Sequence, residues 1–346
     1  MPEEPVSHID FDLLSSKAIS PPLLSHIYTA DPSAHVFEGK IYIYPSHDID
    51  AGDAFDDLGS HFAMEDYHVL SMDHPGSATA TDHGIALQVK DVPWASKQMW
   101  APDAAEKDGK YYLYFPAKDK EGIFRIGVAV SDHPAGPFLP EPEPIKGSFS
   151  IDPAVFRDDD GSYYMYFGGI WGGQLQRWRG GVFNAGEPES PTAFLPADHE
   201  PALTAKVARL SDDLLAFAEE VRDVIILDEN GSPLRQGDKD RRFFEASWMH
   251  QYQGKYYFSY STGDTHYLCY AIGDSPYGPF TYAGRILEPV VGWTSHHSIC
   301  DFNEQWYLFY HDSSLSKGVT HLRCVKLTPL EHDENGLIKT IKPYRD

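Results

Sequence analysis

The sequence predicts an all-β fold, a five-bladed β-propeller, from two repeated phrases and a composition suited to strands. A polar turn followed by an aromatic strand recurs five times along the 346 residues. Aromatic residues make up 14% of the chain, and their rings pack well on the pleated, half-buried surface of a sheet. The five copies of the turn are placed at Gly39, Gly109, Gly161, Gly254 and Glu304.

Each copy is expected to form a hairpin, in which glycine supplies the positive φ that a tight turn requires. The strand after Gly39 reads Lys-Ile-Tyr-Ile-Tyr and the strand after Gly109 reads Lys-Tyr-Tyr-Leu-Tyr, whereas the fifth copy has Glu304 in place of glycine. Near-copies at wide intervals indicate a repeat architecture, and a blade of four strands needs about 40–50 residues. An ordinary β-sandwich with similar hairpins remains the alternative.

A second phrase marks turns between outer strands. It reads Ser-Asp-His-Pro-Ala-Gly-Pro-Phe from Ser131 and Gly-Asp-Ser-Pro-Tyr-Gly-Pro-Phe from Gly273, and its Pro and Gly favour turns. We expect one domain over 1–346, with a long insertion at about 171–243 and no appended carbohydrate-binding domain. Within the insertion, apolar residues near helical spacing predict one helix at 212–224.

The charge and the cysteines limit the partners and the location. A net charge of −24 repels phosphate backbones and anionic lipid, so nucleic acid and membrane partners are disfavoured. Three cysteines do not make a disulfide framework, and no stretch approaches the roughly 18 apolar residues of a membrane span. With no signal peptide recognised at the N-terminus, we expect a cytoplasmic location. The oligomeric state does not follow from the sequence.

One position recurs eight or nine residues before each hairpin turn. In a propeller the innermost strand of each blade faces the central channel, so the residue at the entrance of that strand lies on the channel wall. Carboxylates facing one another raise each other's pKa, and such clusters gather at functional sites. The five residues at this position are Asp31, Trp100, Asp152, Glu245 and His296.

These residue types point to glycoside hydrolysis. The reaction needs one protonated carboxyl group to donate to the leaving oxygen and one carboxylate to activate water or attack the sugar. Glu245 follows Phe243-Phe244 and precedes Ala-Ser-Trp, an apolar setting that would raise its pKa as a general acid requires. Trp100 would offer a flat face to a sugar ring, or serve as a core ring between blades.

The motifs together resemble glycoside hydrolase family 43, five-bladed propeller enzymes that act on xylose- and arabinose-containing glycans. The resemblance covers nearly the whole chain. It rests on Asp31-Pro, Trp100-Ala-Pro-Asp103, Ser150-Ile-Asp152-Pro, Phe244-Glu245-Ala and Ser295-His296-His297-Ser298.

The resemblance implies a role for each matching residue. Asp31 would be the general base, Asp152 would orient the acid and tune its pKa, and Glu245 would be the general acid of an inverting reaction. Arg323 would contact sugar hydroxyls. His296 would help to hold a calcium ion that is largely hydrated, since calcium prefers oxygen ligands; a neutral, hydrogen-bonded histidine without metal is the alternative.

His47 and Asp66 are further candidates for contact with the sugar, although such groups are more often loop caps. The expected substrate is a small oligosaccharide. The resemblance implies an exo-acting β-xylosidase that releases xylose from the non-reducing end of xylo-oligosaccharides. The alternatives are an α-L-arabinofuranosidase or a bifunctional enzyme and, from a different class, a non-catalytic sugar-binding propeller.

Overall fold

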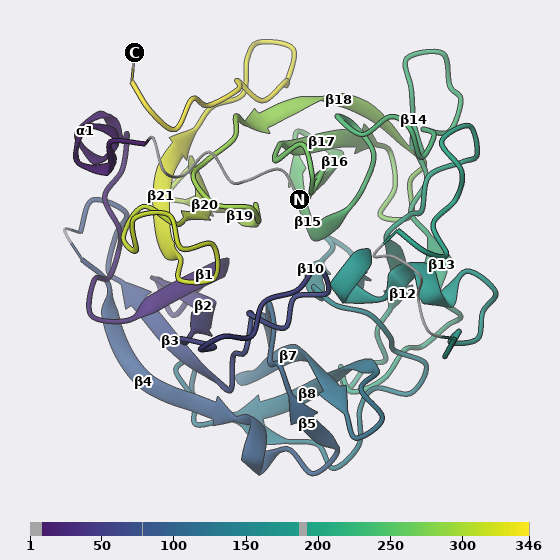
Figure 1. Cartoon of the computed structure of the whole chain (residues 1–346), viewed down its shortest axis with the longest axis horizontal. Coiled ribbons are helices and arrows are strands. Elements are labelled where there is room, and N and C mark those ends of the chain that lie inside the picture. Colours follow the sequence, from purple (N-terminus) through teal and green to yellow (C-terminus); the bar gives the residue numbers. More distant parts are fainter. Residues whose placement is uncertain (1–8, 78, 187–191, 346) are drawn as a thin grey trace.

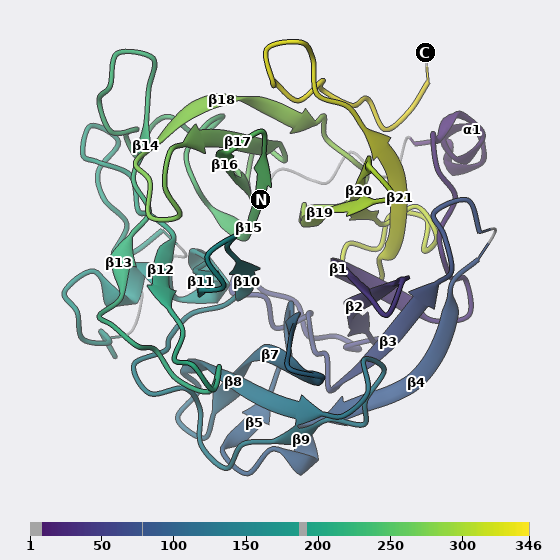
Figure 2. The same cartoon turned by 180° about the vertical axis from the view of Figure 1, so that it is seen from behind.

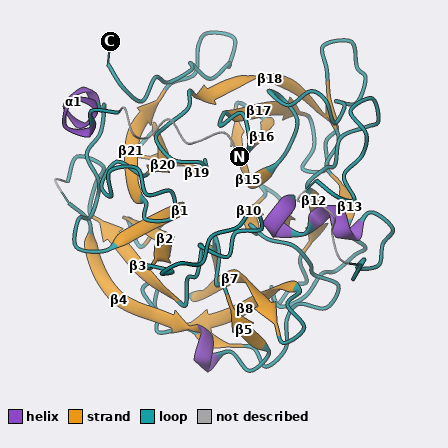
Figure 3. Ribbon diagram, in the orientation of Figure 1, coloured by secondary structure: helices purple, strands orange, loops and turns teal. Residues whose placement is uncertain are grey.

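The computed structural model describes residues 9–77, 79–186 and 192–345, and these form the predicted five-bladed β-propeller. Figure 1 and Figure 2 show five sheets standing around a central axis, and Figure 3 shows how far strands outweigh helices. All strand pairs are antiparallel except β14 with β18.

Each blade begins at the axis and runs outward. Blade 1 consists of β1 (Tyr28–Phe37), β2 (Lys40–Asp48), β3 (Asp66–Met72) and β4 (Thr81–Gln88). Blade 2 consists of β6 (Asp103–Lys107), β7 (Lys110–Asp119), β8 (Phe124–Ser131) and β9 (Leu139–Pro140), and the short strand β5 (Ala95–Lys97) also pairs with β7. Blade 3 consists of β10 (Ala154–Arg157), β11 (Tyr163–Phe167), β12 (Lys206–Arg209) and β13 (Arg222–Asp223). Blade 4 consists of β15 (Glu245–Tyr252), β16 (Lys255–Ser261), β17 (Leu268–Gly273) and β18 (Phe280–Leu287), with β14 (Ile226–Leu227) at its edge. Blade 5 consists of β19 (His297–Phe302), β20 (Gln305–Asp312) and β21 (Cys324–Leu330).

The innermost strands close into a ring. β1 contacts β6, β6 contacts β10, β10 contacts β15, β15 contacts β19, and β19 returns to β1. Backbone hydrogen bonds also join the two ends of the chain: Leu23 N–H donates to the Val325 carbonyl and Thr29 N–H to the Arg323 carbonyl, both at 2.9 Å. Closure of this kind leaves only short, protected sheet edges.

The core consists of layers between neighbouring blades. Five hydrophobic clusters each lie mainly between two adjacent blades, and they account for every neighbouring pair around the ring. Between blades 1 and 2, for example, Tyr42 and Val69 pack with Leu113 and Ala129. Burial of this apolar surface is what holds the blades around the axis.

All five predicted hairpins are present. Four are two-residue turns, and in the fifth repeat Asn303 and Glu304 take φ values of 54° and 66°, the conformation that glycine supplies elsewhere. The two repeated phrases also contact each other: Tyr44 Oη donates to the Pro134 carbonyl at 2.7 Å, and Tyr166 Oη to the Pro276 carbonyl at 2.6 Å. A tyrosine in one blade thus anchors the outer turn of the next.

The helix predicted at 212–224 is wrong, because this segment forms turns and bends that lead into strand β13. Asp213 Oδ1 accepts hydrogen bonds from Ser211 Oγ and from the Leu215 N–H, which competes with helical hydrogen bonding. Leu214 has a φ of 62°, a left-handed conformation that interrupts a helix, and its carbonyl accepts from Tyr114 Oη. The apolar spacing instead reflects packing against blades 2 and 3.

The α-helix of the described residues is α1 (Phe11–Lys17), which the sequence analysis did not predict. The Asp10 carboxylate caps it by accepting from the Leu13 N–H at 3.0 Å. It lies beside the C-terminal segment, where Arg345 N–H donates to the Lys17 carbonyl (Figure 1). No helix among the described residues is long and apolar enough to cross a membrane.

The segment at 171–243 is only partly an insertion. It contains β12 and β13, which complete blade 3, and β14, which pairs with blade 4. The remainder includes two short 3₁₀ turns, η3 (Trp171–Gly173) and η4 (Leu175–Trp178). A further 3₁₀ turn, η2 (Val89–Asp91), follows blade 1.

Candidate active site

A pocket of about 750 Å³ opens where the inner strands begin. The structure brings all five residues of the recurring position to its lining, together with Arg323. Asp31 lies in β1, Asp152 lies just before β10, Glu245 starts β15, His296 lies just before β19, and Trp100 precedes β6. Sequence spacing alone therefore located most of the site.

Irregular backbone aims the carboxylates into the pocket. Asp31 and Asp152 have φ values of 49° and 58°, which are uncommon for residues other than glycine. The register of β1 with β2 shifts between Ala30 and Ser33, and a similar shift follows Glu245 in β15. Such bulges re-aim side chains and often accompany functional sites.

Asp31 is buried and held by hydrogen bonds at both oxygens. Its Oδ1 accepts from Arg323 Nη1 at 2.9 Å and its Oδ2 from Ser46 Oγ at 2.7 Å. The Asp31 N–H donates to His311 Nδ1 at 3.0 Å. Burial raises the pKa of Asp31, but the charge of Arg323 and, to a lesser degree, His296, His311 and Ser46 lower it to about 2. Asp31 is therefore ionised throughout the neutral range.

Arg323 bonds directly to Asp31 and is itself held in place by a second carboxylate, Asp48. Its Nε and Nη2 form a two-point contact with Asp48, at 2.9 and 2.7 Å, while Nη1 contacts Asp31 and Thr294 Oγ1. Burial lowers the pKa of Arg323, but the two carboxylates raise it above its usual value. Protein atoms occupy most of its donors, so the structure gives it an orienting role toward Asp31; the predicted contact with sugar hydroxyls stays a prediction.

The surroundings of Glu245 and Asp152 raise their pKa values, whereas those of Asp31 lower its pKa. Burial and the charge of Asp31 raise the pKa of Glu245 to about 8, with Arg323 acting in the opposite direction. Burial, then the charges of Glu245 and Asp31, raise the pKa of Asp152 well above its ordinary value. Asp152 Oδ2 accepts from the Ala246 N–H at 2.8 Å, which ties it to the backbone beside Glu245. Glu245 is thus suited to carry a proton at neutral pH.

His296 faces both aspartates. Its Nδ1 lies 3.6 Å from Asp31 Oδ1 and 3.9 Å from Asp152 Oδ2. Burial lowers the pKa of His296 to about 4, against the opposing effect of Asp31, so its imidazole is neutral and has a lone pair to offer.

Tryptophans form the apolar walls. Trp100 lines the pocket, but it is only 9% exposed and its Nε1–H donates to the Phe62 carbonyl at 2.8 Å. Trp100 therefore packs against its neighbours in the protein and also forms part of the pocket wall. Trp171 and Trp293 stack with ring centroids 5.5 Å apart and also line the pocket. The sequence analysis did not single out Trp293, which lies outside the repeated motifs.

His47 and Asp66, predicted to contact the sugar, do not line this pocket. They bond to each other instead, with His47 Nδ1 and Asp66 Oδ1 2.6 Å apart. The geometry of the described residues gives their predicted contact with the sugar no support.

Ser46 and His311 are partners of the site that the sequence did not predict, and Asp48, which follows the predicted His47, holds Arg323. A signal existed for two of them. The dipeptide His-Asp ends the second strand of both the first and the last repeats, as His47-Asp48 and His311-Asp312. Both aspartates are buried, and each bonds to a basic residue of β21 or of the segment before it.

Residues 81–338 match the family described as Glycosyl hydrolases family 43. The chain belongs to this family. Its fold and the order of its site motifs agree with that membership, and it is a glycoside hydrolase rather than a non-catalytic propeller.

Family 43 relatives match over nearly their whole length. Xylosidase/arabinosidase 43A of Humicola insolens is 64% identical over 93% of this chain and 99% of its own. The beta-xylosidase of Xylanibacter ruminicola is 58% identical over 91% and 97%. A GH43 beta-xylosidase/alpha-arabinofuranosidase from a compost microbial metagenome, solved with xylotriose in a calcium-free form, is 67% identical over 95% and 99%, with a TM-score of 0.92.

Proposed function

We propose that this family 43 enzyme is an inverting exo-glycosidase that releases xylose from the non-reducing end of xylo-oligosaccharides. The observation that carries the proposal is the opposite protonation of two carboxyl groups in one pocket, with Asp31 ionised and Glu245 protonated. Such divergent pKa values mark an acid and a base. The relatives named xylosidase or beta-xylosidase support the choice of sugar.

In the proposed reaction, Asp31 accepts a proton from water while the water oxygen attacks the anomeric carbon. Glu245 donates its proton to the glycosidic oxygen as the bond from the anomeric carbon to that oxygen breaks. Asp152 positions Glu245 through the Ala246 N–H, and the negative charge of Asp31 helps to keep the acid protonated. Asp31 and Glu245 come from blades 1 and 4, which are not neighbours, and this favours the wider carboxyl separation of inverting enzymes.

The pocket suits a short oligosaccharide. Its volume of about 750 Å³ lies in the range of small-ligand sites, and indole faces pack well against the C–H side of sugars. The Xanthomonas citri family 43 enzyme, 59% identical to this chain with a TM-score of 0.90, was solved with xylotriose. α-L-Arabinofuranosidase activity is the second candidate, because two of the closely similar relatives are named for both activities.

We also propose that calcium binds beside His296. The neutral imidazole offers one nitrogen, and the carboxylates of Asp31 and Asp152 lie within 4 Å of it, so the donor set fits an ion that keeps most of its water. When bound, calcium would supply positive charge that offsets the repulsion among the acids. The calcium-free form of a similar enzyme supports the proposal. Calorimetric titration of the chelated protein with Ca²⁺ tests it, with His296→Ala expected to abolish binding.

A cytoplasmic location is proposed on the three cysteines, which are buried and unpaired. Free thiols are usual in a reducing compartment. Fractionation of the native cells, with detection by antibody, tests this location.

Proton NMR during hydrolysis of xylobiose and xylotriose tests the reaction. The expected first product is α-xylose, released one unit at a time, and an aryl α-L-arabinofuranoside run in parallel measures the second activity. Asp31→Asn serves as the inactive control. Initial formation of β-xylose would refute inversion, and release of no xylose above the control would refute the xylosidase assignment.

A further inference from the structure

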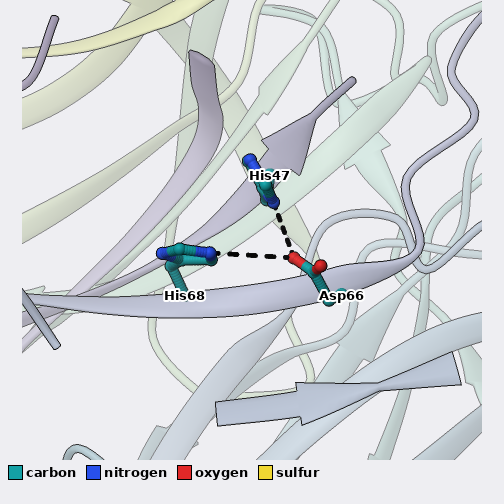
Figure 4. A group of neighbouring side chains, drawn as sticks. All are labelled: His47, Asp66 and His68. Carbon is teal, nitrogen blue, oxygen red and sulfur yellow. Dashed lines mark hydrogen bonds and ion pairs between the residues drawn. The ribbon is translucent and has the colours of Figure 1, made fainter. Parts of the chain in front are cut away.

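A second group of titratable side chains lies on blade 1, outside the lining of the active-site pocket. His47 lies next to the last residue of β2, Asp66 and His68 lie at the start of β3, and Figure 4 shows their side chains converging. We call these three residues the blade-1 histidine cluster. Their ligand atoms all lie within 4.8 Å of one another, and no other such group of three occurs among the described residues.

The fold brings the cluster together by strand pairing. β2 and β3 are antiparallel with Ile43 opposite Leu70, so the end of β2, where His47 lies, runs beside the start of β3, where Asp66 lies. Asp66 and His68 are two positions apart on one strand, so they share a face of the sheet. The three side chains are therefore placed by two neighbouring strands rather than by a loop.

A second carboxylate orients His68. Its Nδ1 lies 2.8 Å from Asp82 Oδ1, and Asp82 in turn accepts from the Gly84 N–H at 2.8 Å and contacts His26 Nε2 at 2.9 Å. The Asp82 carboxylate accepts the Nδ1 proton of His68, which leaves His68 Nε2 as the nitrogen with the lone pair.

His68 Nε2, which carries the lone pair, lies near a second acceptor atom, Asp66 Oδ1. His68 Nε2 lies 4.0 Å from Asp66 Oδ1, too far for a hydrogen bond and close enough for both atoms to contact one cation. The pattern of a carboxylate, a histidine and an electron-pair acceptor is the one that orients metal-bound histidines in proteins.

We propose that the blade-1 histidine cluster binds a divalent transition metal of the zinc class, through His47 Nδ1, Asp66 Oδ1 and His68 Nε2. Two imidazoles and one carboxylate suit such an ion, whereas calcium and magnesium prefer oxygen alone. The proton now shared by His47 and Asp66 would leave to solvent on binding. The side chains are 12% to 18% exposed, so an ion can enter and water can complete the coordination.

The proposed site is connected to the active site by one residue. His47 belongs to the cluster, and the next residue, Asp48, holds Arg323, which bonds to Asp31. A metal at the cluster would fix the end of β2 and so the position of Asp48. The proposal is independent of the calcium site at His296, which uses other residues.

Zinc titration of chelator-treated protein by calorimetry, in saturating Ca²⁺, tests the proposal. We expect one Zn²⁺ per chain, an affinity at least about tenfold lower in His68→Gln and Asp66→Asn, and a loss of about 10–100-fold in Asp82→Asn, which removes the orienting carboxylate. His83→Gln is the matched control: this exposed histidine of β4 bonds to Ser71 and lies outside the cluster. Its affinity should equal that of the wild type.

Circular dichroism in chelator shows which variants are folded. If a ligand variant does not fold, the visible absorption of the wild-type protein with Co²⁺ decides. Intense bands of a low-coordinate site support the proposal, and the pale spectrum of hydrated Co²⁺ overturns it. Zinc binding that is equally weak in wild type and His68→Gln, or equally reduced in His83→Gln, also overturns it.

Discussion

Asp31 and Glu245 line the same pocket, but their surroundings shift their pKa values in opposite directions. Asp31 has an arginine, a serine hydroxyl and two histidines around it, and its pKa falls to about 2. Glu245 has burial and the negative charge of Asp31, and its pKa rises to about 8. The difference shows that one residue, Arg323, separates the two roles, because it bonds to Asp31 and not to Glu245.

The largest effect is expected from Asp31→Asn. The amide keeps the shape of the side chain but cannot accept the proton of the attacking water, so kcat/KM should fall by about 10⁴-fold for every substrate, whatever its leaving group. Steady-state kinetics on xylobiose and on an aryl β-xyloside measure the loss, with thermal unfolding as the check on folding. Activity within tenfold of the wild type would exclude Asp31 as the base.

Glu245→Gln should discriminate between substrates. Loss of the donated proton should lower kcat/KM for xylobiose by about 10³-fold, within the usual range for general acids. A dinitrophenyl β-xyloside, whose leaving group needs no proton, should lose far less. Equal losses on both substrates would contradict the role of Glu245 as the acid and remove the contrast with Asp31.

Arg323→Lys tests the residue that separates the two carboxyl groups. Lysine keeps the charge but cannot form the two-point contact with Asp48 and also reach Asp31. Loss of one or two charged hydrogen bonds predicts a decrease of about 10–100-fold in kcat/KM. Arg285→Lys on β18, which does not line the pocket, is the matched control. An equal effect of both substitutions would count against the orienting role.

The smallest effect is expected in the dependence of kcat/KM on pH. The active form has Glu245 protonated and Asp31 ionised, so kcat/KM should fall tenfold per pH unit above about 8 and show no acid limb until pH approaches about 2. Asp152 itself carries a proton in this range, because burial and the charge of Glu245 raise its pKa, so Asp152→Asn should leave the alkaline limb in place. A limb that moves to lower pH would show instead that an ionised Asp152 raises the pKa of the acid.

The hairpin spacing foretold the fold and much of the site. Counting back from each turn located Asp31, Asp152, Glu245 and His296, because a nearly constant number of residues separates the hairpin turn of each blade from the pocket. The helix at 212–224 failed for the converse reason. Its apolar residues follow the packing of blades 2 and 3, and periodicity does not distinguish that from a helical face.

Repeats and local spacing thus define the blades, the turns and the residues at the channel, since these depend on neighbours in the chain. Partnerships depend on which blades come together when the ring closes. Arg323 meets Asp31 and Asp48 only because blade 5 packs against blade 1, and no short-range pattern encodes a contact between residues so far apart in the chain. Those long-range contacts set the charge of each carboxyl group. Tertiary structure therefore decided which acid donates and which accepts.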